Sequence, residues 1–501
     1  MTTDVAVAAP SEAAADAGEQ IARAGGNAVD AAVAAALVTM VNEVGIVSPS
    51  SGGFVTVQPG DGSAPQTVDG WMDMPGRAAP AEALRTGTWD VDTAYGGGVT
   101  VTVGPGSVAT HGSIAALGEA QGRWGRLPWA ELVQPAIDVA RSGFRLSAAS
   151  RYYLEYVHAS IFGWDPASHA VVHDPDGEIT TAPIVVPDLA ASLEVVAMEG
   201  PRAMHEGDLA RAISADVLDR GGILGPDDLA AYRPVVRPAL VARLGDWTFG
   251  TNPPPAVGGV CVAAMLRLLD GHPRAPLAEL RWSEADVAHL VRVQRAVLSA
   301  RLDRLEVTDD LAAEAALLLA EVDARGIAAL ESGSTAHVSA TGSDGTACAV
   351  TVSSGYSSGM IAAGTGIYLN NCLGEQELNP RGLHGLAPGT RLLSNMAPTV
   401  GRHTDGTTLA IGSPGADRIT TAIVQALAGF VNGGLGLQAA VNHPRVHVHR
   451  AGRPTEEVKV ETEPSMYFGG VAATLRRPDG HLVAAADPRR DGAVRLVHHD
   501  R

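Results

Sequence analysis

Apolar residues follow a helical spacing in several stretches before residue 332 and shorter, strand-like patterns after it. The stretch from Ser11 to Ala24 predicts a helix that ends at Gly25-Gly26, because glycine readily adopts the backbone conformation that closes a helix. Asn27 can cap a second helix, Ala28 to Val41. This second segment is apolar almost all round, which predicts that the helix is buried.

Further patterns before residue 332 extend this helical character. The Ser- and Gly-rich segment 48–53 predicts a turn, and the alternation from Phe54 to Val57 predicts a strand after it. Residues 110–150 and 188–232 are predicted to form helices that Pro and Gly separate. Residues 282–330 are strongly helical and charged.

The composition changes sharply near residue 332, where the stretch ESGSTAHVSATGSDGTACAVTVSS begins. This stretch predicts two strands, His337 to Ala340 and Ala347 to Ser353, joined by a Gly- and Asp-rich turn. The predicted fold class is α+β, with helices before the break and strands dominating after it. Expected beyond it are a strand at 407–411, a Gly-rich loop at 412–416, a helix at 418–430 and short strands from 445.

Composition places the chain among globular proteins and excludes several classes. It has 501 residues, 46% of them apolar and 18% charged, which is enough for one large domain or two closely packed ones. The net charge of −19, without a basic patch, argues against nucleic acid as a partner. The longest apolar run, Ala31 to Val41, is too short to cross a membrane.

The cysteines and the N-terminus predict a cytoplasmic protein. The three cysteines (Cys261, Cys348 and Cys372) form neither a disulfide framework nor a CxxC pair, which fits a reducing compartment. No basic segment precedes an apolar core at the N-terminus, so we expect no signal peptide.

Two motifs suggest chemistry that their context does not favour. GYSSG, Gly355 to Gly359, matches the nucleophile elbow of α/β-hydrolases, but MIAAGTGIYLNN follows it in place of the required helix, so a Ser/Gly loop is favoured over Ser357 as a nucleophile. VHVH places His447 and His449 on one face of a strand, yet no third ligand has a convincing spacing. Exposed strand histidines are the favoured interpretation, and no metal or other cofactor is expected.

GSPGADRIT, Gly412 to Thr420, is a Gly-rich loop that leads into a helix. It lacks the Lys of a phosphate-binding P-loop, but free backbone N–H groups at a helix start can bind an anion. That anion is either a phosphate or a transient oxyanion. A tight turn followed by a helix cap is the simpler alternative.

GSTAHVS, Gly333 to Ser339, is the most informative motif. A small, flexible approach ends at Thr335, at the start of a predicted strand. If the peptide bond before Thr335 breaks, this residue carries both a hydroxyl and an α-amine with a pKa of about 7.7–8.0. Such an amine can act as general base for its own hydroxyl near neutral pH. Taken alone, a threonine that begins a strand remains the simpler interpretation.

Several motifs together resemble the γ-glutamyltranspeptidase family. GGNAVDAAVAAALVTMVNEVG followed by SSGGF is similar to the N-terminal signature of that family, and NPPPAVGG is similar to its PPPSSGG segment. TAHVS, DG and TVSS resemble its TTHYS…DG…TYT core. GTGIYLNN, LLSNMAPTV, GSPGADRITTAIVQ and AVNHPRVH follow in the family order. The resemblance covers nearly the whole chain through independent motifs.

This resemblance implies an αββα four-layer sandwich that is made as a precursor. The chain would cut itself between Ser334 and Thr335, giving a large, helix-rich subunit of residues 1–334 and a small, strand-rich subunit of residues 335–501. The resemblance implies that each subunit has the other as its partner, in a heterodimer or in a dimer of heterodimers. The break in composition near residue 332 falls at this point.

The resemblance also implies roles for individual residues. Thr335 is the implied nucleophile, and Ser353 stands where the family has a supporting Thr. Gly415 and Ala416 occupy the oxyanion-hole positions, where backbone N–H groups matter. Ser394 and Asn395 match a Ser-Ser pair that binds the carboxylate of the substrate.

The implied γ-glutamyl pocket is altered. The Arg that clamps the glutamate carboxylate in the family aligns with Pro80, and Arg77 lies nearby as a substitute or as an ordinary surface Arg. The Asp that holds the glutamate amine aligns with Glu375, and a pocket Asn aligns with Gly355. Asn371, which ends GTGIYLNN, is a further substrate-binding candidate. Loss of a bidentate partner would remove much of the specificity for glutamate.

These features predict a hydrolase of a small acidic or amino-acid-like substrate other than glutathione. The superfamily includes amidases and acylases, and also relatives in actinobacterial antibiotic pathways that cleave a C–C bond next to a keto group, so C–N and C–C cleavage both remain open. The alternatives are a true γ-glutamyl hydrolase or transpeptidase, and a catalytically inactive relative that only binds.

Overall fold

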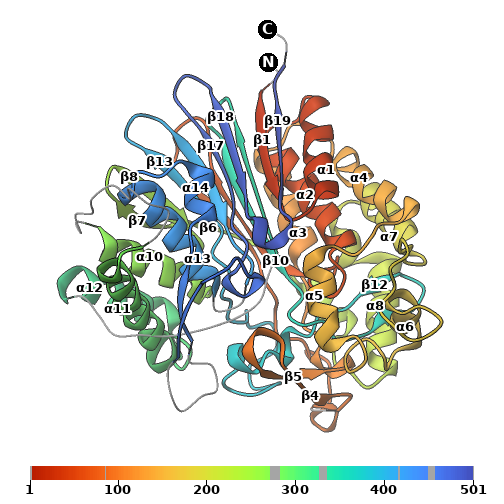
Figure 1. Cartoon of the computed structure of the whole chain (residues 1–501). Coiled ribbons are helices and arrows are strands. Elements are labelled where there is room, and N and C mark those ends of the chain that lie inside the picture. The colour runs from red at the N-terminus through yellow and green to blue at the C-terminus, as the bar shows by residue number, and fades with distance from the viewer. Residues whose placement is uncertain are drawn as a thin grey trace.

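A computed structural model describes residues 3–84, 86–270, 282–325, 336–415, 418–449 and 457–499. Two large antiparallel β-sheets face each other at the centre of the molecule, and helices lie on the outer side of each (Figure 1). The first sheet has the strand order β19-β1-β9-β10-β2-β3-β6, with bounds β19 Ala493–Val497, β1 Val5–Ala9, β9 Ala336–Gly342, β10 Ala347–Ser353, β2 Gly52–Gln58, β3 Gln66–Gly70 and β6 Val235–Pro238. The second has the order β18-β17-β14-β13-β8-β7, with bounds β18 Leu482–Ala486, β17 Ala472–Arg476, β14 Thr408–Gly412, β13 Thr399–His403, β8 Trp247–Thr251 and β7 Leu240–Leu244.

Each sheet has its own helical cover. Helices α1 (Glu12–Arg23), α2 (Ala28–Asn42) and α3 (Ser113–Trp124) pack on the first sheet, and α4 (Trp129–Ser142) and α7 (Leu189–Glu199) lie outside them. Helices α10 (Val257–Leu269), α13 (Arg418–Leu427) and α14 (Leu437–Asn442) pack on the second sheet, with α11 (Glu284–Ala300) and α12 (Leu311–Arg325) outside. The mixed helix and sheet class predicted from the sequence is confirmed.

The first two helices form as their sequence predicts. Ser11 accepts a hydrogen bond from the backbone of Ala14 at the start of α1, and Gly25 has a φ of +98° just beyond its end. Asn27 and Asp30 form a reciprocal capping box at the start of α2. Every residue of α2 is buried, as its apolar circumference predicts.

The distribution of strands corrects one expectation. Strands do not simply follow helices along the chain, because β1, β2, β3, β6, β7 and β8 all precede residue 332. Both sheets therefore combine strands from either side of the predicted cleavage point. These early strands are short and lie between helical stretches, and β1 and β9 pair across more than 300 residues of sequence, which no local pattern can indicate.

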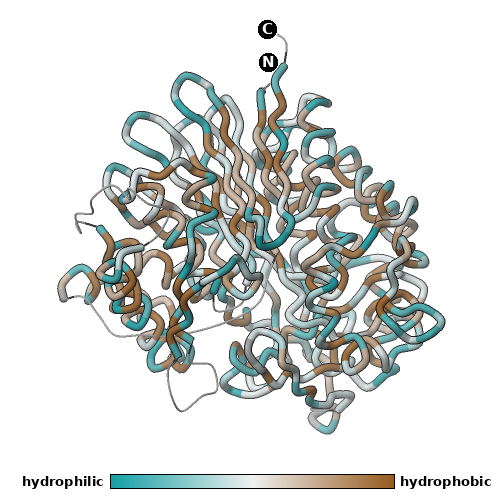
Figure 2. Tube along the Cα trace, in the orientation of Figure 1, coloured by the Kyte–Doolittle hydropathy of each residue, from teal (hydrophilic) through white to brown (hydrophobic). Residues whose placement is uncertain are grey.

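Smaller elements complete the molecule. Figure 2 shows hydrophobic colour along the central strands and hydrophilic colour on many outer loops. Among the described residues, no helix has both the length and the apolar character needed to cross a membrane.

The described residues also form three two-stranded pairs and four further helices outside the two large sheets and their covering helices. These are β4 Trp89–Thr93 with β5 Val99–Val103, β11 Ile361–Ala362 with β12 Ile367–Tyr368, β15 Val446–His449 with β16 Glu457–Val460, α5 Ala148–Val157, α6 Pro166–Val172, α8 Gly207–Asp219 and α9 Pro226–Ala231.

Candidate active site

The ends of three strands of the first sheet meet next to the predicted nucleophile in the sequence. Strand β9 begins at Ala336, opposite Val352 of β10, and Ser353 at the end of β10 lies opposite Gly52 at the start of β2. Ser334 and Thr335, the predicted cleavage site and nucleophile, lie outside the described residues. Thr335 directly precedes Ala336 in the sequence.

The second sheet meets the first at this same end. A Cβ atom placed on Gly412, the last residue of β14, would lie 2.3 Å from the imidazole of His337, the second residue of β9. The indole N–H of Trp71, just after β3, donates to the carbonyl of Leu393 at 2.7 Å. The first contact joins the start of β9 to the end of β14, and the pairing of Thr399 with Ile411 places the segment before β13 beside the same end of β14. The second contact joins that segment to the end of β3.

Ser353 is buried at the end of β10, and its hydroxyl accepts a hydrogen bond from the N–H of Gly355 at 3.1 Å. The structure gathers three predicted binding residues just beyond it. A Cβ atom on Gly355 would lie 2.5 Å from Asn371 Oδ1 and 3.1 Å from Glu375 Oε1. Asn371 Oδ1 accepts the N–H of Tyr356 at 2.6 Å, which fixes the amide against this corner.

Glu375 is a buried carboxyl group, only 1% exposed, within this cluster. Its Oε1 atom has no hydrogen-bond partner among the described residues. Burial, with the nearby Glu377 charge, raises the pKa of Glu375 to about 8. A buried, perturbed carboxyl group of this kind is typical of a functional site.

Ser394 and Asn395 lie in the segment that leads into β13. Ser394 forms a parallel bridge with Ala256, and its carbonyl accepts the N–H of Gly258 at 3.0 Å. Gly258 has to lack a side chain, because a Cβ atom there would lie 1.9 Å from the carbonyl oxygen of Asn395. The amide of Asn395 is 3% exposed, and neither of its polar atoms has a partner in the part of the chain that the structure describes. An amide so placed is available to a ligand.

The predicted oxyanion loop connects β14 to α13. Gly415 is buried with a φ of +124°, a conformation that favours glycine. Its carbonyl accepts the N–H of Arg418 at 3.0 Å at the start of α13. Ala416, the other predicted oxyanion residue, lies outside the described residues.

Arg77, the candidate for a carboxylate clamp, and Pro80, which aligns with the clamping Arg of the family, are both exposed. The side chain of Arg77 is 41% exposed, and its nearest carboxylate is that of Asp228, 3.9 Å from Nε. Pro80 lies in an exposed loop. The polar neighbours that the sequence did not indicate are Trp71, bonded beside Ser394, and Arg391, a partly buried cation whose Nε lies 3.2 Å from Asp73. Trp71 is the last residue of the sequence DGW at the end of β3, and that short sequence carries no signal of a functional role.

Two other motifs have defined positions. The sequence predicts that no helix follows Ser357, and the structure confirms this. The Ser357 hydroxyl donates to the backbone carbonyl of Leu369 at 3.3 Å.

The expectation that His447 and His449 are exposed is wrong, since both are buried under Tyr467. The two histidines do lie on a strand, as predicted. However, α11 and α13 pack against this strand, β15, and the local sequence does not reveal that packing.

Comparisons with known proteins agree with this arrangement. Acylase ACY 1 proenzyme of Pseudomonas sp. (strain V22) is 30% identical, over 95% of this chain and 90% of the relative. Glutathione hydrolase proenzyme of Pseudomonas aeruginosa is 30% identical, over 98% of this chain and 94% of the relative. The crystal structure of cephalosporin acylase from Bacillus halodurans has a TM-score of 0.80 at 21% identity, covering 99% and 96% of the two chains.

The fold is that of the N-terminal-nucleophile hydrolases, and the protein is an enzyme of this class. The profile described as Gamma-glutamyltranspeptidase matches residues 14–497. The chain belongs to the gamma-glutamyltranspeptidase family.

Proposed function

We propose that the protein is a self-processing threonine hydrolase whose nucleophile is Thr335. The observation that supports this most strongly is the meeting of four segments, namely the start of β9, the end of β10, the segment before β13 and the loop after β14. Ser353, Asn395 and Gly415 belong to these segments, and β9 begins directly after Thr335. Cleavage between Ser334 and Thr335 would give subunits 1–334 and 335–501, which remain together as a heterodimer.

The proposed reaction uses few groups. The new α-amine of Thr335 takes the proton of the Thr335 hydroxyl, which attacks the substrate carbonyl. Backbone N–H groups of Gly415 and Ala416 stabilise the oxyanion, and Ser353 supports the nucleophile by hydrogen bonding. The leaving group departs with a proton, and water then attacks the acyl-Thr335 ester to release the acid and regenerate the enzyme.

The substrate is proposed to be a small acidic or amino-acid-like molecule in a biosynthetic pathway, rather than glutathione. Asn395 offers a side-chain amide that has no partner among the described residues. Glu375 offers a carboxyl group whose raised pKa favours the neutral form near neutral pH. The indole of Trp71 stands beside Ser394, and Arg77 lies toward solvent. The bond cleaved is an amide C–N bond or a C–C bond next to a keto group; in the second case, the stabilised carbanion that leaves takes up the proton.

Architecture and location follow from the same proposal. We infer that the order of helices, sheet, sheet and helices corresponds to the αββα sandwich of N-terminal-nucleophile hydrolases. We also propose a cytoplasmic location, since all three cysteines are free and buried. Two heterodimers in one assembly remain a further proposal.

A denaturing gel and mass spectrometry test this function. Purified wild-type protein should give two polypeptides, and Thr335→Ala should give one uncut chain without activity. Treatment with 4-nitrophenyl acetate should add one acetyl group to the fragment that begins with Thr335. A folded wild-type protein that stays uncut and unacylated would refute the proposal.

A γ-glutamyl hydrolase or transpeptidase is the second candidate. It is supported by the similarity to a glutathione hydrolase proenzyme and by the carboxyl group of Glu375 at the amine-holding position. Rapid release of the chromophore from a γ-glutamyl anilide would favour this candidate over the first. Acylation of Thr335 without turnover of that anilide would favour the first.

A further inference from the structure

We infer that the segment Ser465–Gly470 positions the candidate oxyanion loop, Ser413–Gly415, and that Ser413 and Arg418 are positioning residues that connect the two. This inference rests on the proposed function, because it assumes that the loop stabilises an oxyanion. The segment contains a short 3₁₀ turn, Met466–Phe468, and belongs to the C-terminal region that precedes β17.

The first connection is made by Ser413. Its hydroxyl accepts the N–H of Gly470 at 3.1 Å and donates to the carbonyl of Pro414 at 2.7 Å. Ser413 is buried, so loss of the hydroxyl would leave the N–H of Gly470 without its partner. The same hydroxyl also restrains the carbonyl one residue before Gly415.

The second connection is direct contact between two backbones. A Cβ atom on Gly415 would lie 2.7 Å from Cα of Gly469, and a Cβ atom on Gly469 would lie 2.7 Å from the Ser413 hydroxyl. Both glycines have positive φ, +124° for Gly415 and +88° for Gly469. With no side chain between them, a displacement of the segment would be passed directly to the loop.

The third connection is made by Arg418, the first residue of α13. Its Nε donates to the carbonyl of Tyr467 at 2.8 Å, and its guanidinium carbon lies 4.7 Å from the centre of the Tyr467 ring. Its own N–H donates to the carbonyl of Gly415. A cation at the N-terminus of a helix opposes the helix dipole, so helix stability does not account for this buried arginine.

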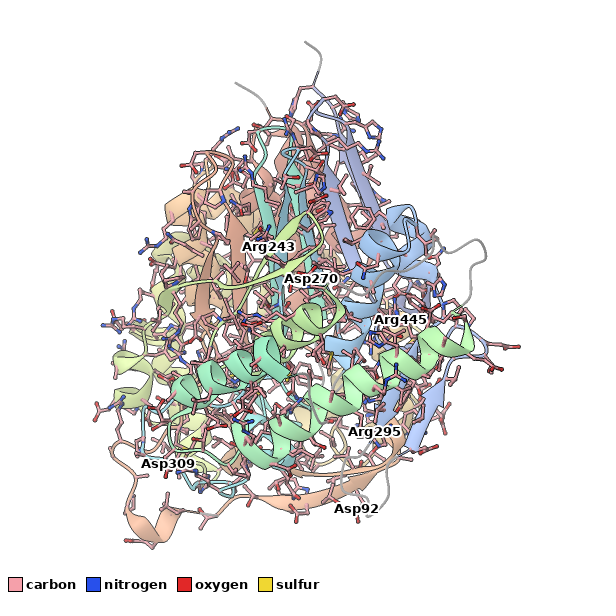
Figure 3. All side chains as sticks on the ribbon, turned by 90° about the vertical axis from the view of Figure 1, so that its left-hand side faces the viewer. Asp92, Arg243, Asp270, Arg295, Asp309 and Arg445 are labelled. Carbon is pink, nitrogen blue, oxygen red and sulfur yellow. The ribbon has the colours of Figure 1, made fainter. Side chains whose placement is uncertain are left out.

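The supporting segment is itself held by a buried ion network. Arg445 pairs with Asp487 at 2.5 Å, and Arg489 pairs with both Asp487, at 3.0 Å, and Glu461, at 2.6 Å. Burial alone would raise the pKa of Asp487. The charges of Arg445 and Arg489 nevertheless hold this pKa below its ordinary value. Arg445 lies in the C-terminal region near α11 (Figure 3), whose Gln294 donates to the carbonyl of Val446 at 2.9 Å.

This network bonds both ends of the segment. Arg445 donates to the carbonyl of Phe468 at 2.8 Å, Glu461 accepts the N–H of Ser465 at 3.1 Å, and Asp487 accepts the N–H of Val471 at 2.8 Å. Buried ion pairs are a weak source of stability, but a fully bonded network restricts the backbone to one geometry. Such restriction is what an oxyanion donor requires, because the donor has to stand about 2.7–3.1 Å from the developing charge.

The inference is tested by measuring how fast 4-nitrophenyl acetate acylates Thr335 in the wild-type protein and in the variants Ser413→Ala and Arg418→Lys. The saturating acylation rate should fall about 10- to 100-fold, while the half-saturating ester concentration changes less than about twofold, because misplaced donors affect the transition state and not ester binding. Ser413→Thr keeps the hydroxyl and should recover most of the rate. Ser192→Ala is the matched control, since this buried serine bonds the carbonyl of Thr365 far along the chain; it should lower stability only.

The outcomes separate this inference from the proposed function. A wild-type protein that is not acylated at Thr335 would refute the proposed function itself. A wild-type protein that is acylated, with Ser413→Ala and Arg418→Lys both within about twofold of its rate, would overturn only the inference about the segment. If Ser413→Ala does not fold, Arg418→Lys and Ser413→Thr still decide between these results.

Discussion

At the scale of single residues, burial strongly changes the properties of the carboxyl group of Glu375. It is buried beside Gly355 and Asn371, with one oxygen unpaired among the described residues and a pKa of about 8. The sequence indicated these three positions through a family resemblance. It could not indicate Trp71 and Arg391, because the partners of both come from segments more than 150 residues away.

Glu375→Gln should remove a pH-dependent cost from the folded protein. In the unfolded chain the carboxyl ionises above about pH 4.5, but in the folded protein only above about 8. At this site the folded state therefore binds more protons in this window, and the contribution of Glu375 to wild-type stability falls as pH rises from 4.5 to 8. Glutamine does not titrate, so the stability of the variant relative to wild type should rise by a few kcal/mol between pH 5 and pH 8.

Thermal unfolding at pH 5, 6.5 and 8 measures this difference. Glu119→Gln, which removes a carboxylate paired with Arg123 on the surface of α3, serves as the control. Parallel pH profiles for wild type and Glu375→Gln would show that Glu375 does not titrate between 4.5 and 8.

At the scale of elements, the contact between the two sheets decides where the site forms. The imidazole of His337 on β9 bonds Thr351 at 2.7 Å and Ser339 at 2.8 Å, and it fills the space above Gly412 on β14. Burial lowers the pKa of His337 to about 3, so the ring is neutral near pH 7. The sequence predicted both strands but not their contact, because the two residues are distant along the chain.

Gly412→Ala should therefore clash with His337. The added methyl group has to displace a bonded ring or the strand, which typically costs about 1–3 kcal/mol. His337→Ala leaves room for the methyl group, so the double variant should lose less stability than the sum of the two single variants. Gly122→Ala, at an open position of α3, should be neutral or slightly stabilising. Additive losses in the cycle would disprove direct contact between Gly412 and His337.

At the scale of the whole molecule, the two predicted subunits are interleaved. β1 and β2 pair with β9 and β10 in the first sheet, and β8 pairs with β13 in the second. Separating residues 1–334 from 335–501 would break these ladders and expose the apolar faces of both sheets. The two-part organisation expected from the sequence is therefore not a division into independent folding units.

The cleaved protein should stay together until it unfolds. Gel filtration without denaturant should give one species that contains both polypeptides, with the elution volume of uncut Thr335→Ala. Residues 1–334 expressed alone should be insoluble or lack cooperative unfolding, because β1 loses both of its neighbouring strands, β2 loses β10 and β8 loses β13. Recovery of a stable, folded 1–334 fragment would contradict this prediction.

The sequence by itself determined the local elements and the family. Caps at Ser11 and Asn27, the alternation of β9 and β10, and the Gly-rich turn at Gly415 depend on neighbouring residues, whose preferences act over a few positions. Only the tertiary structure decided the pairing of β1 with β9, the burial of His447 and the support of the loop by Ser465–Gly470. These depend on contacts between distant segments, and hydrophobic burial selects them without leaving a local pattern.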